Sequence, residues 1–269
     1  MAETDLNPLT DDAPEEIPLA AAPLVRVVCQ VRFTEIIKIA EKNFIADFQE
    51  AIRERYPGFQ QEQSQNLEVQ GGAINVSNET IWRFFDPGQN WRLSLSSGSI
   101  ALETKHAYSS RADFIERIAF VMQQLEETIR PTHISRIGVR YIDQVQFEKM
   151  DDIRGMLREE MLGLKGSEFS GHIERFLNQL ECRTREGKLL ANWGILPANR
   201  THDANMMPAV DKPSWFLDLD TFVLYDKSVK EFDSRHIERT AYDLAARAYA
   251  FFRWSVEDKF LATFRDEAK

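Results

Sequence analysis

The sequence predicts an α+β fold in which a largely antiparallel, curved sheet carries helices on one of its faces. Three observations lead to this class. Apolar and polar residues alternate in several short runs, apolar residues recur every three or four positions in the segments between them, and turn residues separate successive strand-like runs. The chain has 269 residues and is 43% hydrophobic, which is enough to bury a sizeable core.

The first half of the expected fold begins with a strand at Val25–Phe33, where five apolar residues at alternate positions share one face. A helix is expected at about 41–56, and Pro57 ends it. Three strand-like runs with turn residues between them predict an antiparallel meander at residues 80–86, 91–96 and 100–104. A helix over 111–129, with Ser110 as its N-cap, completes this half.

The same order of elements returns after Pro131. A strand is expected at 135–141 and a helix at 151–162. A second meander and a long helix follow, with strands at 173–183, 188–196 and 215–225 and the helix at 234–255.

The opening strands of the two halves share a Val-Arg-aromatic motif, at Val31–Phe33 and Val139–Tyr141. Chance matches of this length are also expected in strand-rich sequence. Because the element order is shared as well, we favour an internal duplication. The predicted halves are residues 23–132 and 133–269, as two similar parts or one continuous domain.

The N-terminal segment differs from the rest in composition. Residues 1–22 contain six carboxylates and no basic residue, so they carry −6 of the net charge of −10. An acidic segment that is rich in Pro and Ala and lacks aromatic residues buries too little apolar surface to offset its ordering entropy. We therefore expect a disordered acidic tail over 1–22.

Several classes of protein are disfavoured. No apolar run approaches the roughly 18 residues of a membrane helix, and no signal peptide precedes the body. The distant cysteines Cys29 and Cys182 fit a reducing compartment, so a cytoplasmic location is predicted. The body has no cluster of Lys and Arg, which counts against nucleic-acid binding.

An aromatic cluster is the first candidate site. Trp82, Trp91 and Tyr108 lie in or next to the first meander and could form a platform for stacking a base or gripping an anchor residue. Strand aromatics more often fill the core, and we favour that interpretation.

Arginines on the polar sides of the two opening strands are the second candidate. Arg32, Arg136 and Arg140 could bind a phosphate or carboxylate in bidentate fashion, with Glu103 nearby. The alternative is cross-strand ion pairing, which we favour. The carboxylates available for it are those of Glu103, Asp143 and Asp218.

Catalytic and metal-binding signatures are missing from the sequence. Asp218 and Asp220 could share a strand face and hold a divalent metal, but no third carboxylate is identifiable. The five histidines are scattered, and no nucleotide-binding or hydrolase motif occurs. We therefore predict no metal, no cofactor and no catalytic residue, and we lean towards a protein that is not an enzyme.

Several short motifs, taken in order, resemble a sporadically distributed family of uncharacterised bacterial proteins of about 250 residues. They begin with the Pro23–Phe33 strand and the Trp82-x-Phe84 to Trp91 spacing. The others are Leu102-Glu-Thr-x-x-x-Tyr108, Arg136–Tyr141 and Trp254-Ser-Val-x-Asp-x-Phe260. The family has no established activity, and its sporadic distribution implies mobile or defence-linked gene neighbourhoods.

Three functional hypotheses remain, in order of preference. The first is a protein-binding module of a bacterial toxin–antitoxin, immunity or phage-defence system. The second is a small-molecule or nucleotide sensor that uses the arginines and aromatics, and the third is a metal-dependent hydrolase. The sequence does not identify the protein partner, and it leaves homo-oligomerisation open.

Overall fold

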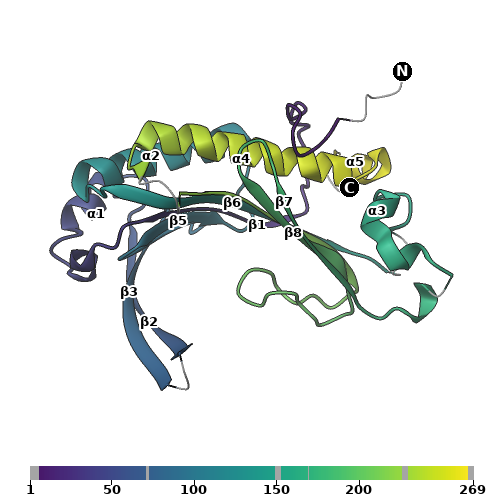
Figure 1. Cartoon of the computed structure of the whole chain (residues 1–269), viewed down its shortest axis with the longest axis horizontal. Helices are drawn as coiled ribbons and strands as arrows, with labels where there is room; N and C mark the ends of the chain where they lie inside the picture. Colours follow the sequence, from purple (N-terminus) through teal and green to yellow (C-terminus); the bar gives the residue numbers. More distant parts are fainter. Residues whose placement is uncertain (1–5, 71–72, 149–152, 169, 226–229, 266–269) are drawn as a thin grey trace. The chain divides into compact units, whose positions relative to one another are not determined.

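The computed structural model describes residues 6–70, 73–148, 153–168, 170–225 and 230–265 (Figure 1). In this part of the chain the fold is α+β, with ten strands in a large open antiparallel sheet and five α-helices. None of the described helices is long and apolar enough to cross a membrane.

The chain divides into two compact units that are interleaved in sequence. The first unit comprises Met1–Val27, Val139–Val223 and Tyr242–Lys269, and the second comprises Val28–Gly138 and Leu224–Ala241. Strands β1 (Leu24–Phe33) and β6 (His133–Gln146) and helix α4 (Ser234–Ser255) run through both units. This division does not follow the boundary at 132/133 that the sequence suggests.

In the second unit the strands are hydrogen-bonded in the order β2-β3-β4-β5-β1-β6, and the two-residue strand β10 pairs with β6. The strands not yet placed are β2 (Gly58–Gln70), β3 (Ala73–Phe85), β4 (Trp91–Ser96), β5 (Ser99–Thr104) and β10 (Lys230–Glu231). The helical segments are the 3-10 helix η1 (Ile37–Ala40), α1 (Ala46–Ile52) and α2 (Arg111–Thr128).

Helices α1 and α2 cover the same face of the meander. The Phe48 ring of α1 packs edge-on against Phe84 of β3, and the Phe114 ring of α2 stacks on Trp91 of β4. Phe84 and Trp91 point to one side of the sheet, because Phe84 is paired with Leu93, two residues from Trp91. As predicted, the Ser110 hydroxyl caps α2 by accepting a hydrogen bond from the Asp113 amide.

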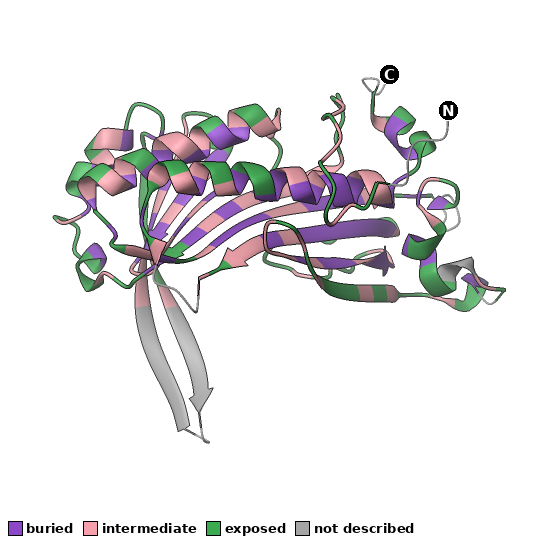
Figure 2. Cartoon of the chain, turned by 45° about the horizontal axis from the view of Figure 1, so that its top comes forward, coloured by how far each residue is buried: buried purple, intermediate pink, exposed green. Residues whose placement is uncertain are grey.

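In the first unit the strands are ordered β1-β6-β9-β8-β7. The elements not yet placed are β7 (Phe176–Arg183), β8 (Lys188–Leu196), β9 (Ser214–Leu224), α3 (Glu159–Leu162) and α5 (Asp258–Arg265), with short 3-10 helices at Gly163–Gly166 and Ser170–His172. Buried and exposed residues alternate in stripes along α4 (Figure 2).

Both faces of β9 are covered. Trp215, Leu217 and Leu219 join the large apolar core that α4 and α5 complete with Phe251 and Phe260. Phe216 points to the other face and packs in a smaller cluster with Ile142, Leu196 and Met207. The second cluster includes Met207 because the segment 197–213 folds back over that face.

Some predicted elements differ from the structure. The helix expected at 41–56 is limited to Ala46–Ile52, and the one expected at 151–162 is helical only at Glu159–Leu162, with 151 and 152 outside the described residues. The paired 13-residue strands β2 and β3 extend well beyond the strand expected at 80–86. Cross-strand pairing stabilises both strands, and a single-strand pattern does not reveal it.

The acidic N-terminal segment also differs from its prediction. Residues 6–22 follow a defined path over the first unit, where Leu9, Ile17 and Leu19 pack against the large apolar core. The segment buries little apolar surface by itself, but in the folded chain the body supplies the surface on which it packs. Residues 1–5 lie outside the described part.

Candidate functional site

Arg140 and Asp218 form the most specific charged contact among the predicted site residues. Arg140 lies on β6 and Asp218 on the neighbouring strand β9. Arg140 Nε and Nη2 donate to the two Asp218 carboxylate oxygens at 2.7 and 2.6 Å, the bidentate geometry that suits guanidinium and carboxylate. The exposed fractions of the side chains are 27% and 3%, so the pair is largely shielded from solvent.

The segment 197–213 adds a second carboxylate to this pair. Asp203 Oδ2 lies 3.5 Å from Arg140 Nη2. A turn fixes Asp203, since its carbonyl accepts from the Met206 and Met207 amides. The neighbouring His202 ring stacks on Phe216 at 4.9 Å between centroids, so the segment is anchored on both sides of Asp203.

The surrounding carboxylates determine what Arg140 can bind. Burial opposes the charged form of Arg140, but Asp218, Asp220 and Asp203 outweigh burial and raise the pKa of the guanidinium. Because Asp218 binds the guanidinium in bidentate fashion and Asp203 lies close by, few donors of Arg140 remain for an anionic ligand. The geometry therefore favours the ion-pair interpretation of Arg140.

The other predicted arginines lie in the second unit. Arg32 Nε and Arg136 Nη1 both donate to Gln30 Oε1, at 3.1 and 3.4 Å. Glu103 forms an ion pair with Arg92, its direct cross-strand partner. The carboxylate of Glu103 is therefore already used by its neighbour.

The predicted aromatic residues pack inside the second unit. Trp82 is 1% exposed and its Nε1 donates to the Ile39 carbonyl at 2.6 Å. Trp91 is also buried and stacks on Phe114, and Tyr108 contacts the edge of that ring. These contacts favour core packing over a stacking platform, because no broad ring face of either tryptophan is left open.

The seven predicted site residues thus separate into small groups. Trp91 and Tyr108 meet at Phe114, and Arg32 and Arg136 meet at Gln30. Trp82 and Glu103 have other partners within the second unit, and Arg140 belongs to the first unit. In the described residues no group of three or more His, Cys, Asp or Glu side chains is arranged for a metal ion, Asp218 and Asp220 included.

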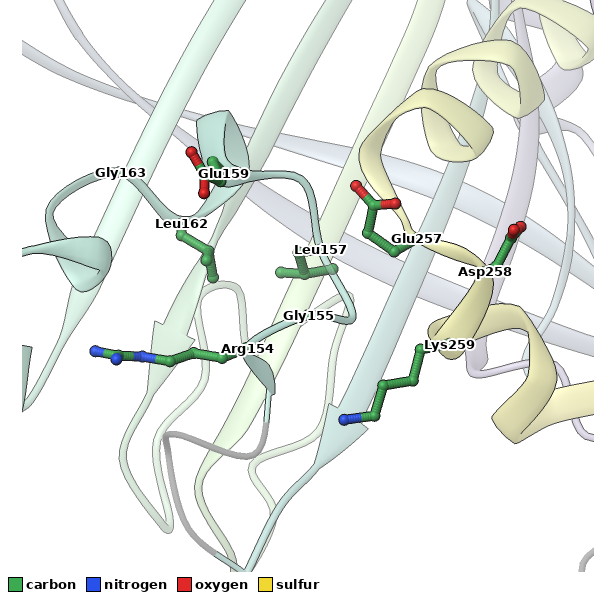
Figure 3. A pocket seen from close by; sticks show the side chains of 9 residues that line it. All are labelled: Arg154, Gly155, Leu157, Glu159, Leu162, Gly163, Glu257, Asp258 and Lys259. Carbon is green, nitrogen blue, oxygen red and sulfur yellow. The ribbon is translucent and has the colours of Figure 1, made fainter. Parts of the chain in front are cut away.

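A pocket of about 830 Å³ in the first unit was not predicted (Figure 3). Two buried leucines, Leu157 and Leu162, line its interior. The charged lining residues are Arg154, Glu159, Glu257, Asp258 and Lys259, and the rest are Gly155 and Gly163. Both glycines have positive φ, of 74° and 48°, but neither stands in a sequence motif that could have revealed the pocket.

Strand β7 was expected from the sequence at 173–183 and forms at Phe176–Arg183, but its position at the end of the sheet was not predicted. It is the last strand in the described sheet order, so one of its edges has no neighbouring strand there. Leu177 and Leu180 point to opposite faces and are each 38% exposed. The strand contains neither Pro nor Lys, which often block the pairing of edge strands.

The hairpin turn fixes which backbone groups of β7 point outward. The Thr184 amide donates to the Gly187 carbonyl at 2.9 Å, so even-numbered residues of β7 direct their N–H and C=O groups to β8. Odd-numbered residues, including Leu177 and Glu181, direct theirs away from the sheet. This edge is able to accept a further strand.

Comparison with known proteins does not assign the chain to a family. No protein-family model matches it, and no curated protein matches it.

Proposed function

We propose that this protein is a non-enzymatic binding module that holds a partner protein by strand addition at the outer edge of β7. The observation that carries the proposal is an eight-residue edge strand whose side chains Leu177 and Leu180 are exposed on both faces. In strand addition, backbone hydrogen bonds provide affinity and alternate side chains provide specificity. An extended partner segment would cover one leucine on each face.

We further propose that the protein acts in the cytoplasm, in a bacterial toxin–antitoxin, immunity or phage-defence system. The resemblance of residues 23–269 to a sporadically distributed bacterial family supports this context. Strand order supports the proposed duplication, because β1 is followed along the sheet by β5, β4 and β3, and β6 by β9, β8 and β7.

The alternative, a small-molecule sensor, is supported by the pocket that Leu157 and Lys259 help to line. Its lining combines cationic and anionic side chains with buried leucines, which suits a ligand that carries both charges. Arg140 gives the sensor hypothesis less support, because Asp218 already occupies its guanidinium. The same pairing weakens the metal-dependent hydrolase hypothesis, in which Asp218 would bind the metal.

The proposal is tested by capturing partners from the native host and identifying them by mass spectrometry, with Glu181→Pro and Glu181→Ala as a matched pair. Both substitutions remove the surface ion pair with Lys188, which contributes little. Only proline removes the outward N–H of residue 181. We expect a reproducible partner that Glu181→Ala retains and Glu181→Pro loses while the fold is kept.

Two results would contradict strand addition. One is a partner that Glu181→Pro binds as well as the unchanged protein does. The other is a chain that captures no partner but is stabilised by small molecules in a thermal-shift screen, which would favour the sensor, especially if Lys259→Ala abolished the effect.

A further inference from the structure

Residues 6–22, here called the N-terminal strap, run alongside the C-terminal part of α4 (purple in Figure 1). The strap contains turns at 8–10 and 20–21 but no helix or strand. Three of its apolar side chains, those of Leu9, Ile17 and Leu19, pack against the large core of the first unit. The strap is therefore a largely irregular segment that packs on the body through a few apolar side chains.

Two arginines of the body hold the first part of the strap. Arg247 is 1% exposed, binds Glu186 through two hydrogen bonds of 2.8 Å and donates its remaining Nη1 to the Pro8 carbonyl at 2.7 Å. The Arg185 amide donates to the Leu9 carbonyl at 3.0 Å, and Arg185 Nη1 pairs with Asp12 at 2.7 Å. Both residues thus donate hydrogen bonds to backbone carbonyls of the strap, and Arg185 also forms an ion pair with one of its carboxylates.

Tyr249 holds the second part of the strap. Its hydroxyl accepts a hydrogen bond from the Ile17 amide at 2.7 Å and donates to the Glu15 carbonyl at 3.2 Å. Further along, the Ala21 amide donates to the Phe264 carbonyl at 3.2 Å. Backbone groups are thus hydrogen-bonded at Pro8, Leu9, Glu15, Ile17 and Ala21, and the aliphatic side chains of the strap pack on the core at or close to these points.

The strap contacts the body as a bound peptide would, through separate backbone hydrogen bonds and a few aliphatic side chains. The strap has four carboxylates and no basic residue between 6 and 22, and the body presents Arg185 and Arg247 to it. It makes no ladder of backbone hydrogen bonds with the sheet, so its release would leave every strand pairing intact. Segments of this composition pay their ordering entropy when they bind, so their affinity per unit of interface area is low.

We propose that the surface beneath the strap is an exchangeable groove for an extended, acidic peptide segment with aliphatic anchors. Residues 6–22 are its resident occupant, and a segment of the same chemistry from a partner protein displaces them. The tether raises the local concentration of the strap to the order of millimolar, so a partner segment must be tighter or multivalent to compete. This proposal does not depend on strand addition at β7.

The test uses a fluorescent synthetic peptide of residues 6–22 and the full chain carrying Leu9→Asp and Ile17→Asp, which weaken the strap and leave the groove unchanged. In fluorescence anisotropy we expect the peptide to bind this variant at least about ten-fold more tightly than it binds the unchanged chain, in which the tethered strap competes. The peptide should also raise the thermal midpoint of the variant.

A matched control removes a single contact of the groove. Tyr249→Phe, added to the strap-weakened chain, deletes only the hydroxyl that bonds Ile17 and Glu15, and it should weaken peptide binding several-fold. A peptide that carries Ile17→Asp should not bind.

Three outcomes would overturn the proposal. The strap-weakened chain could lose its cooperative thermal transition, which would make the strap a structural part of the core. It could stay folded without binding the peptide. Finally, the unchanged chain could form a dimer that Leu9→Asp and Ile17→Asp abolish, which would assign the groove to the strap of a second copy.

Discussion

The guanidinium of Arg140 and the carboxylate of Asp218 face each other edge to edge, through two hydrogen bonds of 2.7 and 2.6 Å. The two residues are 78 positions apart in sequence and become neighbours because β6 and β9 are adjacent. Asp218 is almost fully withdrawn from solvent, so it depends on Arg140 for compensation of its charge. This pairing explains why Arg140, a candidate binding residue in the sequence, has a structural role instead.

Arg140→Ala is expected to lower the free energy of unfolding by about 3–5 kcal/mol, because it leaves the Asp218 charge buried without its main partner. Urea unfolding measures the effect. In a double-mutant cycle, Arg140→Ala with Asp218→Ala should cost less than the sum of the single changes. Additive costs would show that the pair contributes no coupling.

Trp82→Phe is expected to destabilise the second unit by roughly 1–3 kcal/mol, since it removes the hydrogen bond to Ile39 and leaves a small void. Partner capture should be unaffected, because Trp82 is buried. Denaturant unfolding and host capture on the same preparation distinguish the two roles. Loss of capture with unchanged stability would make Trp82 a binding residue.

Asp143 should make the protein less stable as the pH rises from about 4 to 7. It lies on β6 between Tyr141 and Val145, which pack on the large apolar core, and burial raises its pKa to about 7. Because the folded state holds the proton more tightly than the unfolded state, stability is present at low pH and is lost through this window. The full loss of stability across this window is on the order of 4 kcal/mol.

Asp143→Asn tests this dependence through urea unfolding at pH 5.5 and 8.5. The variant should lose less stability than the unchanged protein between these values. Asp233→Asn is a comparison of opposite sign, because hydrogen bonds from the His236 and Arg235 amides lower the pKa of Asp233. The stability that the Asp233 carboxylate contributes is lost as the pH falls. Identical pH profiles for Asp143→Asn and the unchanged protein would refute the role of Asp143.

The Cys29 thiol is expected to be inert in the folded protein. It is buried, and burial raises its pKa to about 12, so the reactive thiolate is scarce at neutral pH. A thiol-reactive dye should label at most Cys182 in the native state and both cysteines in urea. Labelling of Cys29 in a native Cys182→Ser protein would show that this strand opens.

Local patterns were sufficient for many of the elements. The predicted bounds of β8 at 188–196 and of α4 at 234–255 match the structure, and α2 ends one residue before its predicted limit. In each of these segments apolar residues recur at regular spacing and the ends carry clear start and stop residues, so residues close in sequence determine its bounds. The core assignment of Trp82 and Trp91 likewise needed only their alternation on strands.

Features that depend on distant partners were not accessible to the same reasoning. The long strands β2 and β3 are fixed by their mutual pairing, and the strap by Arg247 and Tyr249, more than 200 residues away in sequence. The open edge of β7 follows from the order of the whole sheet. No local signal encodes a partner that is brought close only by folding.

By itself, the sequence determined the α+β class, most element positions and the burial of Trp82 and Trp91, because short-range periodicity sets which side of an element is apolar. The tertiary structure alone decided that Arg140 is paired with Asp218, that residues 6–22 are seated on the body and that β7 is the last strand in the described part of the sheet. These are pairings between segments far apart in sequence, and their free energies depend on which surfaces the fold brings together.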